Sequence, residues 1–149
     1  MYRTSRPDAS PAALYIAITT AQWMWLNAIT LAERKVALGA APVFMYIFSY
    51  ASQEPVMPGV DFPAGAAHVT EIPFKFNHPG GSLNSDKNPD RIRAARNMSR
   101  AWASFAGTGN PNHDEIPKWP AYTIEQRATM FLDAECRVVK DPYQEERLL

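Results

Sequence analysis

The segment PVFMYIFSY, at residues 42–50, constrains the fold more than any other part of this sequence. Apolar residues fill both of its alternating faces, and it carries no charge. A strand has this composition when helices cover both sides of its sheet. Such a strand needs hydrogen-bonded neighbours, and a complete α/β domain of this length has about four or five of them. No other segment matches as strongly, so the sequence predicts an α/β fold with an incomplete sheet, completed by further chain or by another subunit.

The other elements are predicted from helical periodicity and from turn residues. We expect helices over 11–18, 21–38 and 89–106, a loop over 52–67, short strands over 128–133 and 136–140 that could form a hairpin, and a helical turn after Asp141. Thr20 is expected to cap the second helix, and Gly39 to end it. Residues 71–76 fit either a helical turn or an extended run. A small α+β domain with a three-stranded sheet is the alternative to an incomplete α/β fold.

The two longer helices each have one apolar face, which we expect to be buried. The predicted buried residues are Met24, Trp25, Ala28, Leu31, Ala32 and Val36 in the second helix, and Ile92, Ala95, Ser99, Trp102 and Ala106 in the long helix. Three phenylalanines, Phe62, Phe74 and Phe76, are expected to pack in the core rather than to line a substrate pocket.

Composition excludes several classes of function. Fifteen basic residues balance fifteen acidic ones among 149, so no net field draws the chain to nucleic acid or to an anionic membrane. No apolar stretch approaches the roughly 20 residues that span a bilayer, and the first residues do not resemble a signal peptide. The single cysteine, Cys136, is expected to be a buried thiol, and its isolation fits a reducing compartment such as the cytoplasm.

Among the three histidines, His68 is the best candidate for a general base. It follows the buried strand and ends a loop, and functional groups in α/β folds gather beyond the carboxyl ends of strands. By position alone, a surface or hydrogen-bonded loop histidine is the favoured interpretation. We expect His78 and His113 to be solvated loop residues. No cofactor or metal site is predicted, because HVTE at 68–71 is not a zinc motif and Cys136 has no second cysteine.

The chain contains no Gly-x-Ser-x-Gly elbow for a nucleophilic serine. The elbow needs both glycines because the serine sits on a strained strand-to-helix turn. The closest string, GGSLN at 80–84, lacks the final glycine and follows no strong strand. We therefore interpret Ser82 as a turn residue.

The string GAAHVTEIPFKF, at 65–76, resembles the catalytic-histidine motif of type-B carboxylesterases, the family that includes para-nitrobenzyl esterases and cholinesterases. In that family a Gly-x-x-His loop is followed by an acidic residue, isoleucine and an aromatic-rich run. Further similar strings follow in the family's order over nearly the whole chain: RPDASPAAL (6–14), ITLAERKVALGAAPVFMYIFSY (29–50), MSRAWASFAGTGNPN (98–112), WPAYT (119–123), ATMFLD (128–133) and DPYQEERL (141–148).

The resemblance implies that residues 1–149 are the C-terminal part of an α/β-hydrolase with His68 as the triad histidine. The serine, the oxyanion-hole glycines and the acid would lie in an N-terminal part, on the same gene or on a separate chain. The substrate would be a small carboxylic ester. We expect the isolated chain to be inactive and, because of its uncharged 42–50 strand, prone to aggregate. A non-catalytic cholinesterase-like binding module and a subunit of a split esterase are the alternatives.

Overall fold

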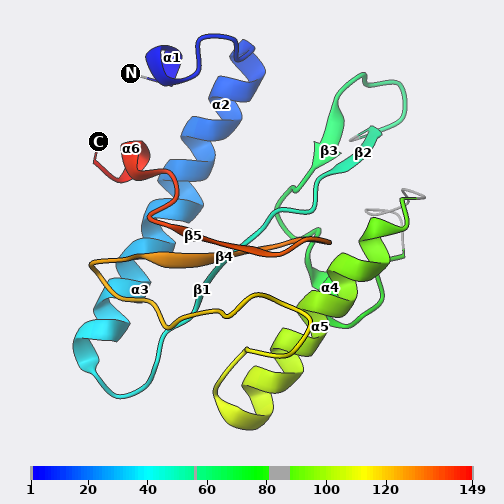
Figure 1. Ribbon diagram of the computed structural model, residues 1–149. Helices are drawn as coiled ribbons and strands as arrows, with labels where there is room; N and C mark the ends of the chain where they lie inside the picture. The colour runs from blue at the N-terminus through cyan, green and yellow to red at the C-terminus, as the bar shows by residue number, and fades with distance from the viewer. Residues whose placement is uncertain (1, 56, 81–87, 149) are drawn as a thin grey trace.

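The structure is a computed structural model that describes residues 2–55, 57–80 and 88–148. Figure 1 shows a small central sheet with a long helical rod along one side and a second long helix on the other. The rod consists of α2 (Pro11–Thr20), the π-helix η1 (Ala21–Trp25) and α3 (Leu26–Leu38), and the second helix is α5 (Asp90–Thr108). This layering confirms the predicted α/β class.

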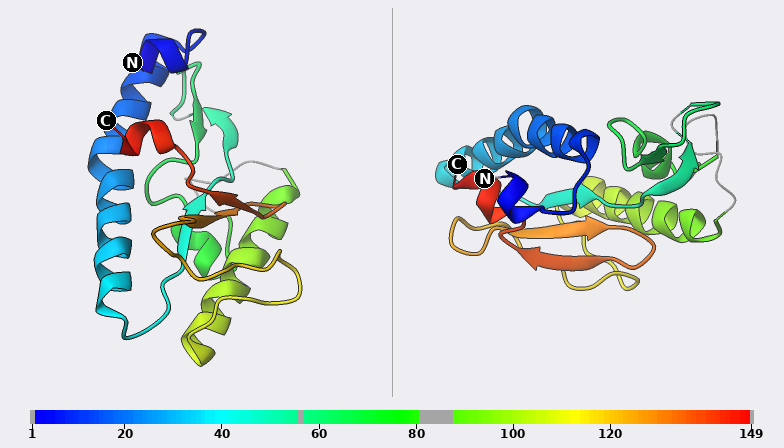
Figure 2. Two further views of the ribbon diagram at one scale, coloured as in Figure 1. Left: turned by 60° about the vertical axis from the view of Figure 1, so that its left-hand side comes forward. Right: turned by 90° about the horizontal axis from the view of Figure 1, so that it is seen from above.

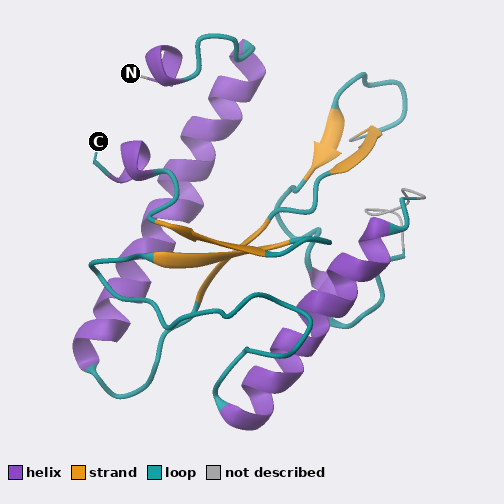
Figure 3. Cartoon of the chain, viewed as in Figure 1, coloured by secondary structure: helices purple, strands orange, loops and turns teal. Residues whose placement is uncertain are grey.

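The sheet has three strands in the order β1–β4–β5 (Figure 3). Strand β1 (Met45–Phe48) pairs in parallel with β4 (Ala128–Leu132), and β4 pairs in antiparallel with β5 (Arg137–Lys140). The predicted hairpin is therefore confirmed. The predicted strand over 42–50 is shorter, and β1 has a strand partner on one edge only among the described residues.

Strand β4 lies at the centre of the sheet, and all five of its residues are buried. The sequence interpretation was wrong to rank 42–50 as the one strong buried strand. Thr129 and Met130 are both fully buried, whereas three of the four residues of β1 are only half-buried. The reason is position, because β4 has strands on both edges while β1 has one.

The helical rod begins as predicted but does not break at Thr20. The Ser10 Oγ accepts a hydrogen bond from the Ala13 amide at 3.2 Å, and Gly39, at φ +64°, ends α3. Thr20 keeps helical dihedral angles and caps nothing, since the chain continues through η1 into α3. The predicted helix boundary at this residue is wrong.

The π-helix changes which residues of the rod face the sheet. Trp25, Ile29 and Ala32 are buried, but Met24 and Leu31 are 47% and 70% exposed, so their predicted burial is wrong. Hydrogen bonds in a π-helix span five residues instead of four, which rotates the buried face relative to a regular helical pattern.

The buried face of α5 also differs from the prediction. The observed buried residues are Ala94, Ala95, Asn97, Met98 and Ala101. Ile92 is 54% exposed and Ala106 is exposed, while Ser99 and Trp102 are half-buried. The Asn97 amide donates hydrogen bonds to the carbonyls of Asp133 and Ala134 at 2.9 and 3.1 Å, which ties the buried face of α5 to the turn after β4.

The predicted loop over 52–67 contains a second, two-stranded sheet. Strand β2 (Ser52–Pro55) pairs in antiparallel with β3 (Pro63–Gly65), and a short helix α4 (Ile72–Lys75) follows. The helical reading of 71–76 is thus the correct one. Phe74 of α4 is fully buried in the core between β1 and α5, as predicted, whereas Phe76 is 78% exposed.

The two ends of the chain lie side by side (Figure 2). Arg6, just after α1 (Tyr2–Ser5), forms an ion pair with Glu146 of α6 (Gln144–Arg147), and α6 is the predicted final helical turn. Within the described part of the chain, no helix is long and apolar enough to cross a membrane.

We expect Phe74→Ala to lower the free energy of unfolding by about 3–5 kcal/mol, because it leaves a cavity in the core. Phe76→Ala, two residues away on the exposed side, should change it by less than about 0.5 kcal/mol. Urea denaturation followed by circular dichroism measures both, and equal effects of the two variants would contradict the placement of α4.

Candidate active site

His68 lies on an exposed turn between β3 and α4. Phe74 of α4 anchors this segment, because its ring centroid lies 4.9 Å from that of Phe48 and 5.4 Å from that of Tyr50. Phe48 ends β1 and Tyr50 follows it, so the anchor is at the carboxyl end of a parallel strand. Ligands and catalytic groups of α/β proteins gather at this edge.

The backbone of the turn is tightly held and locally strained. Thr70 donates hydrogen bonds to the Ala67 carbonyl from its amide at 3.2 Å and from its hydroxyl at 2.6 Å. Val69, directly after His68, has φ +70°, which a β-branched side chain rarely adopts. Strain of this kind costs on the order of 1–3 kcal/mol and clusters at functional sites. The turn therefore presents His68 outward in a fixed backbone conformation.

The described residues give His68 no hydrogen-bond partner, and no carboxylate orients its ring. The nearest acid in sequence, Glu71, instead pairs with Lys75, whose Nζ lies 3.0 Å from Glu71 Oε1. Lys75 in turn lies over the Trp102 ring at 5.6 Å, so this ion pair ties α4 to α5. The site thus offers an exposed imidazole but no acid to fix its tautomer.

The other two histidines differ from each other. His78 is exposed, as predicted. His113 is not a solvated residue: its Nδ1 accepts from the Glu115 amide at 3.3 Å, and its Nε2 lies 3.1 Å from the Asn97 carbonyl. With Nδ1 accepting from an amide, Nε2 is the ring nitrogen that donates to the Asn97 carbonyl. His113 therefore holds the chain after α5 in place and is unavailable as a base.

A polar pair at the same edge of the sheet was missed by the sequence analysis. The Ser49 hydroxyl donates to Asp133 Oδ2 at 3.0 Å, and the Ser49 amide donates to the Leu132 carbonyl at 2.9 Å. These contacts join the carboxyl ends of β1 and β4. Neither Ser49 nor Asp133 is hydrogen-bonded to a histidine among the described residues, so the pair is structural.

Cys136 is half-buried, and its thiol donates to the Asp133 carbonyl at 3.3 Å. Burial raises the pKa of this thiol, which makes it a poor nucleophile near neutral pH. In the part of the chain that the structure describes, no three His, Cys, Asp or Glu side chains group closely enough to hold a metal ion. Ser82 lies outside the described residues.

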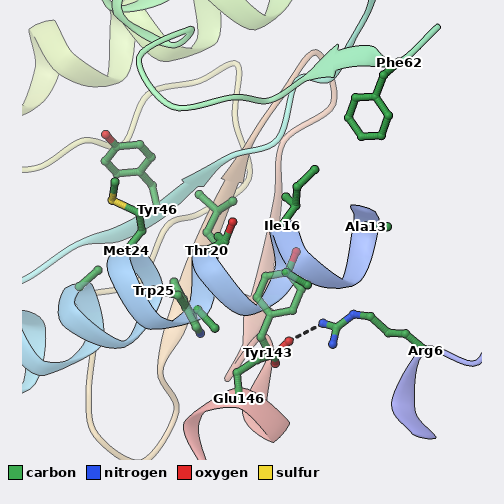
Figure 4. A pocket seen from close by; sticks show the side chains of 14 residues that line it. Arg6, Ala13, Ile16, Thr20, Met24, Trp25, Tyr46, Phe62, Tyr143 and Glu146 are labelled. Atoms are coloured by element: carbon green, nitrogen blue, oxygen red, sulfur yellow. Dashed lines mark hydrogen bonds and ion pairs between the residues drawn. The ribbon is translucent and has the colours of Figure 1, made fainter. Parts of the chain in front are cut away.

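An apolar cavity of about 570 Å³ lies between the helical rod and β1 (Figure 4). Phe62, which is 37% exposed, lies at its wall, so its predicted place in the core is wrong. Tyr46 and Ile47 of β1 also line it. His68 is not one of the lining residues, so the cavity and the exposed histidine are separate features.

The family model described as "Carboxylesterase family" matches residues 3–148 of this chain. Para-nitrobenzyl esterase of Bacillus subtilis (strain 168) is 35% identical over 111 residues, which are 72% of this chain and 21% of that protein. Carboxylesterase 4A of Bos taurus is 39% identical over 101 residues, covering 65% of this chain and 17% of that protein. This chain therefore spans about a fifth of the length of these relatives.

Solved structures show the same similarity at the level of the fold. A crystal structure of a Geobacillus stearothermophilus carboxylesterase superposes with a TM-score of 0.79 at 35% identity, covering 99% of this chain and 30% of that one. A structure titled "PNB ESTERASE" superposes with a TM-score of 0.72 at 29% identity, covering 99% of this chain and 28% of that one.

We expect Val69→Gly to raise the free energy of unfolding by about 1 kcal/mol, because glycine adopts positive φ without strain. Val60→Gly is the matched control, since Val60 and Val69 are 38% and 39% exposed and Val60 has no positive φ. In the control, the free energy of unfolding should fall by roughly 0.5–1 kcal/mol, because glycine gives the unfolded chain more conformational freedom. Urea denaturation distinguishes the two, and a loss at both positions would show that the Val69 backbone is not strained.

Proposed function

Because the chain belongs to the carboxylesterase family, we propose that it is the part of a carboxylic-ester hydrolase that supplies the general base, His68. The observation that carries the proposal is the exposed His68 ring on a strained turn that leads into α4, whose Phe74 packs on Phe48 at the carboxyl end of β1. An imidazole in this place can reach a group outside the described chain. The family match contributes the reaction class.

In the proposed reaction, His68 removes the proton from a serine hydroxyl as the oxygen attacks the ester carbonyl. The imidazolium then gives this proton to the departing alcohol, leaving an acyl-enzyme. In the second half, His68 takes a proton from water, and the attack of water on the acyl group releases the carboxylic acid and the serine. Every step needs the same ring to accept and return one proton.

Two parts of the proposed triad are outside this sequence. The chain has no Gly-x-Ser-x-Gly string, and Glu71, the acid beside His68 in sequence, is engaged by Lys75. The serine and the orienting acid therefore come from another polypeptide segment, whether covalently joined or in a separate chain. The substrate is a small carboxylic ester.

We expect the chain alone to show no enzyme-like hydrolysis of p-nitrophenyl acetate, because a lone imidazole has no nucleophilic serine to activate. Losing the serine of a triad costs on the order of 10⁶ in turnover. The release of p-nitrophenolate by purified chain and by its His68→Ala variant measures this. If the purified chain shows saturable turnover that disappears in His68→Ala, the proposal that the serine lies on another segment is wrong.

The role of His68 is best tested in a chimera in which this chain replaces the matching region of the Geobacillus stearothermophilus carboxylesterase. We expect His68→Ala to lower kcat of the chimera by about 10⁴- to 10⁶-fold. His78→Ala is the matched control, since His78 is also exposed and lies in the next loop. An active chimera whose kcat changes by less than tenfold in His68→Ala would refute the proposal.

A further inference from the structure

Two backbone turns separate His68 from the acidic residue Glu71. The Thr70 amide closes the first turn with a hydrogen bond of 3.2 Å, and the Ile72 amide closes the second with one of 3.1 Å. Three residues of fully extended chain span about 10 Å, and turns of this kind are more compact. A released Glu71 carboxylate therefore has the length to reach the His68 imidazole.

The Glu71 carboxylate is engaged by Lys75 in a partly shielded ion pair. Lys75 Nζ lies 3.0 Å from Glu71 Oε1, and the two side chains are 21% and 19% exposed. Salt and water screen a covered pair less than a fully exposed one, so such a pair restrains its partners more firmly. The position of the Glu71 carboxylate is therefore set by Lys75.

Aromatic side chains of two further elements set the position of the Lys75 ammonium. Lys75 Nζ lies 5.6 Å from the centroid of the Trp102 ring of α5. The Tyr46 ring of β1 meets the Trp102 ring edge-on, with 4.9 Å between the centroids. Burial raises the pKa of the Tyr46 hydroxyl, and the nearby Lys75 ammonium acts in the opposite direction. Lys75 is thus held among α4, α5 and β1.

A free carboxylate beside a triad histidine interferes with catalysis. In a triad, one acid accepts from Nδ1–H and so selects the tautomer whose Nε2 takes the serine proton. A second carboxylate would compete for Nδ1–H or accept from Nε2–H, and either contact would turn the ring away from the serine. Charged acceptors form stronger hydrogen bonds than neutral ones, so a carboxylate is an effective competitor. In the structure, Glu71 pairs with Lys75 instead.

We propose that Lys75 is a positioning residue of the His68 site. It withholds the Glu71 carboxylate from the imidazole, so that His68 takes its orienting acid from the other segment. This role rests on the proposed function, since it concerns the same histidine. The alternative is that Lys75 only fastens α4 to α5. The two roles differ in one respect: if Lys75 only fastens α4, removing the Glu71 charge does not compensate for the loss of Lys75.

The activity test uses the covalent chimera with the Geobacillus stearothermophilus carboxylesterase. We expect Lys75→Met to lower kcat for p-nitrophenyl acetate by about tenfold or more with little change in KM, because ring orientation matters in the transition state. Methionine keeps an apolar side chain beside Trp102. Adding Glu71→Gln should restore kcat to within about threefold of the parent chimera, because a neutral amide competes more weakly for the ring. Lys140→Met, at the exposed end of β5, is the matched control and should leave kcat unchanged.

The tautomer of the His68 ring gives a readout that does not depend on activity. It is measured in this chain, labelled with ¹⁵N-histidine, by NMR at about pH 8, where ordinary imidazoles are neutral. We expect Lys75→Met to raise the Nδ1–H fraction of His68 by about twofold or more, since a nearby carboxylate selects the ring nitrogen that carries the proton. Glu71→Gln in the same background should reverse the change. His78, also exposed, is the internal control.

The outcomes distinguish positioning from fastening. An unchanged kcat and an unchanged His68 tautomer in Lys75→Met would overturn the inference. An equal loss of kcat in Lys75→Met and in the double variant, with the tautomer unchanged, would show that Lys75 only fastens α4 and would also overturn it. Thermal unfolding identifies any variant that has lost its structure. If Lys75→Met unfolds, Lys75→Gln keeps a polar side chain and should give the same two results.

The proposed function can fail separately from this inference. If His68→Ala leaves kcat of the chimera unchanged, the proposed function is wrong, and the tautomer measurement in the chain still decides whether Lys75 withholds Glu71. If His68→Ala abolishes activity while Glu71→Gln fails to rescue Lys75→Met, the proposed function stands and the positioning role of Lys75 is wrong.

Discussion

The parallel pairing of β1 with β4 is the interaction on which the rest of the structure depends. It joins the first half of the chain to the last quarter, and the helical rod and α5 pack on its two faces. The same pairing leaves one edge of β1 without a strand among the described residues. The strand β1 therefore both holds the core together, through β4, and lies at an edge of the sheet.

The pairing also determines where the chemistry lies. Parallel strands bring their carboxyl ends to one edge, and there the Phe48, Tyr50 and Phe74 rings fasten the turn that carries His68. Glu71, the nearest acid to His68 in sequence, is engaged by Lys75, which also lies over the Trp102 ring and ties α4 to α5. Among the described residues, the exposed His68 imidazole has no hydrogen-bond partner.

The sequence revealed the elements that depend on strong local signals. The uncharged 42–50 segment, the Ser10 cap and the Gly39 stop were all recognisable, because each has a direct local cause. His68 was predicted to be catalytic through its family motif, and its position in the chain alone favoured an ordinary loop histidine. The role of His68 remains a prediction from that motif, which the geometry supports.

The features that were missed depend on contacts between distant segments. Strand β4 is central because β1 and β5 pair with its two edges, and its own five residues do not predict these pairings. The π-helix has no sequence signature, so the exposure of Met24 and Leu31 could not be anticipated. Asn97 turned the buried face of α5 through hydrogen bonds to residues 133 and 134, and His113 was fixed by a carbonyl 16 residues away.

In the proposed site, His68 activates a serine that this chain does not contribute. The most direct measurement is the rate at which paraoxon, an organophosphate that phosphorylates activated serines, modifies the elbow serine of the covalent chimera, followed by intact-mass spectrometry. We expect one adduct on that serine, formed at least 10³-fold more slowly in His68→Ala, with the rate partly restored by added imidazole. Phosphorylation at the same rate with and without the His68 imidazole would contradict it.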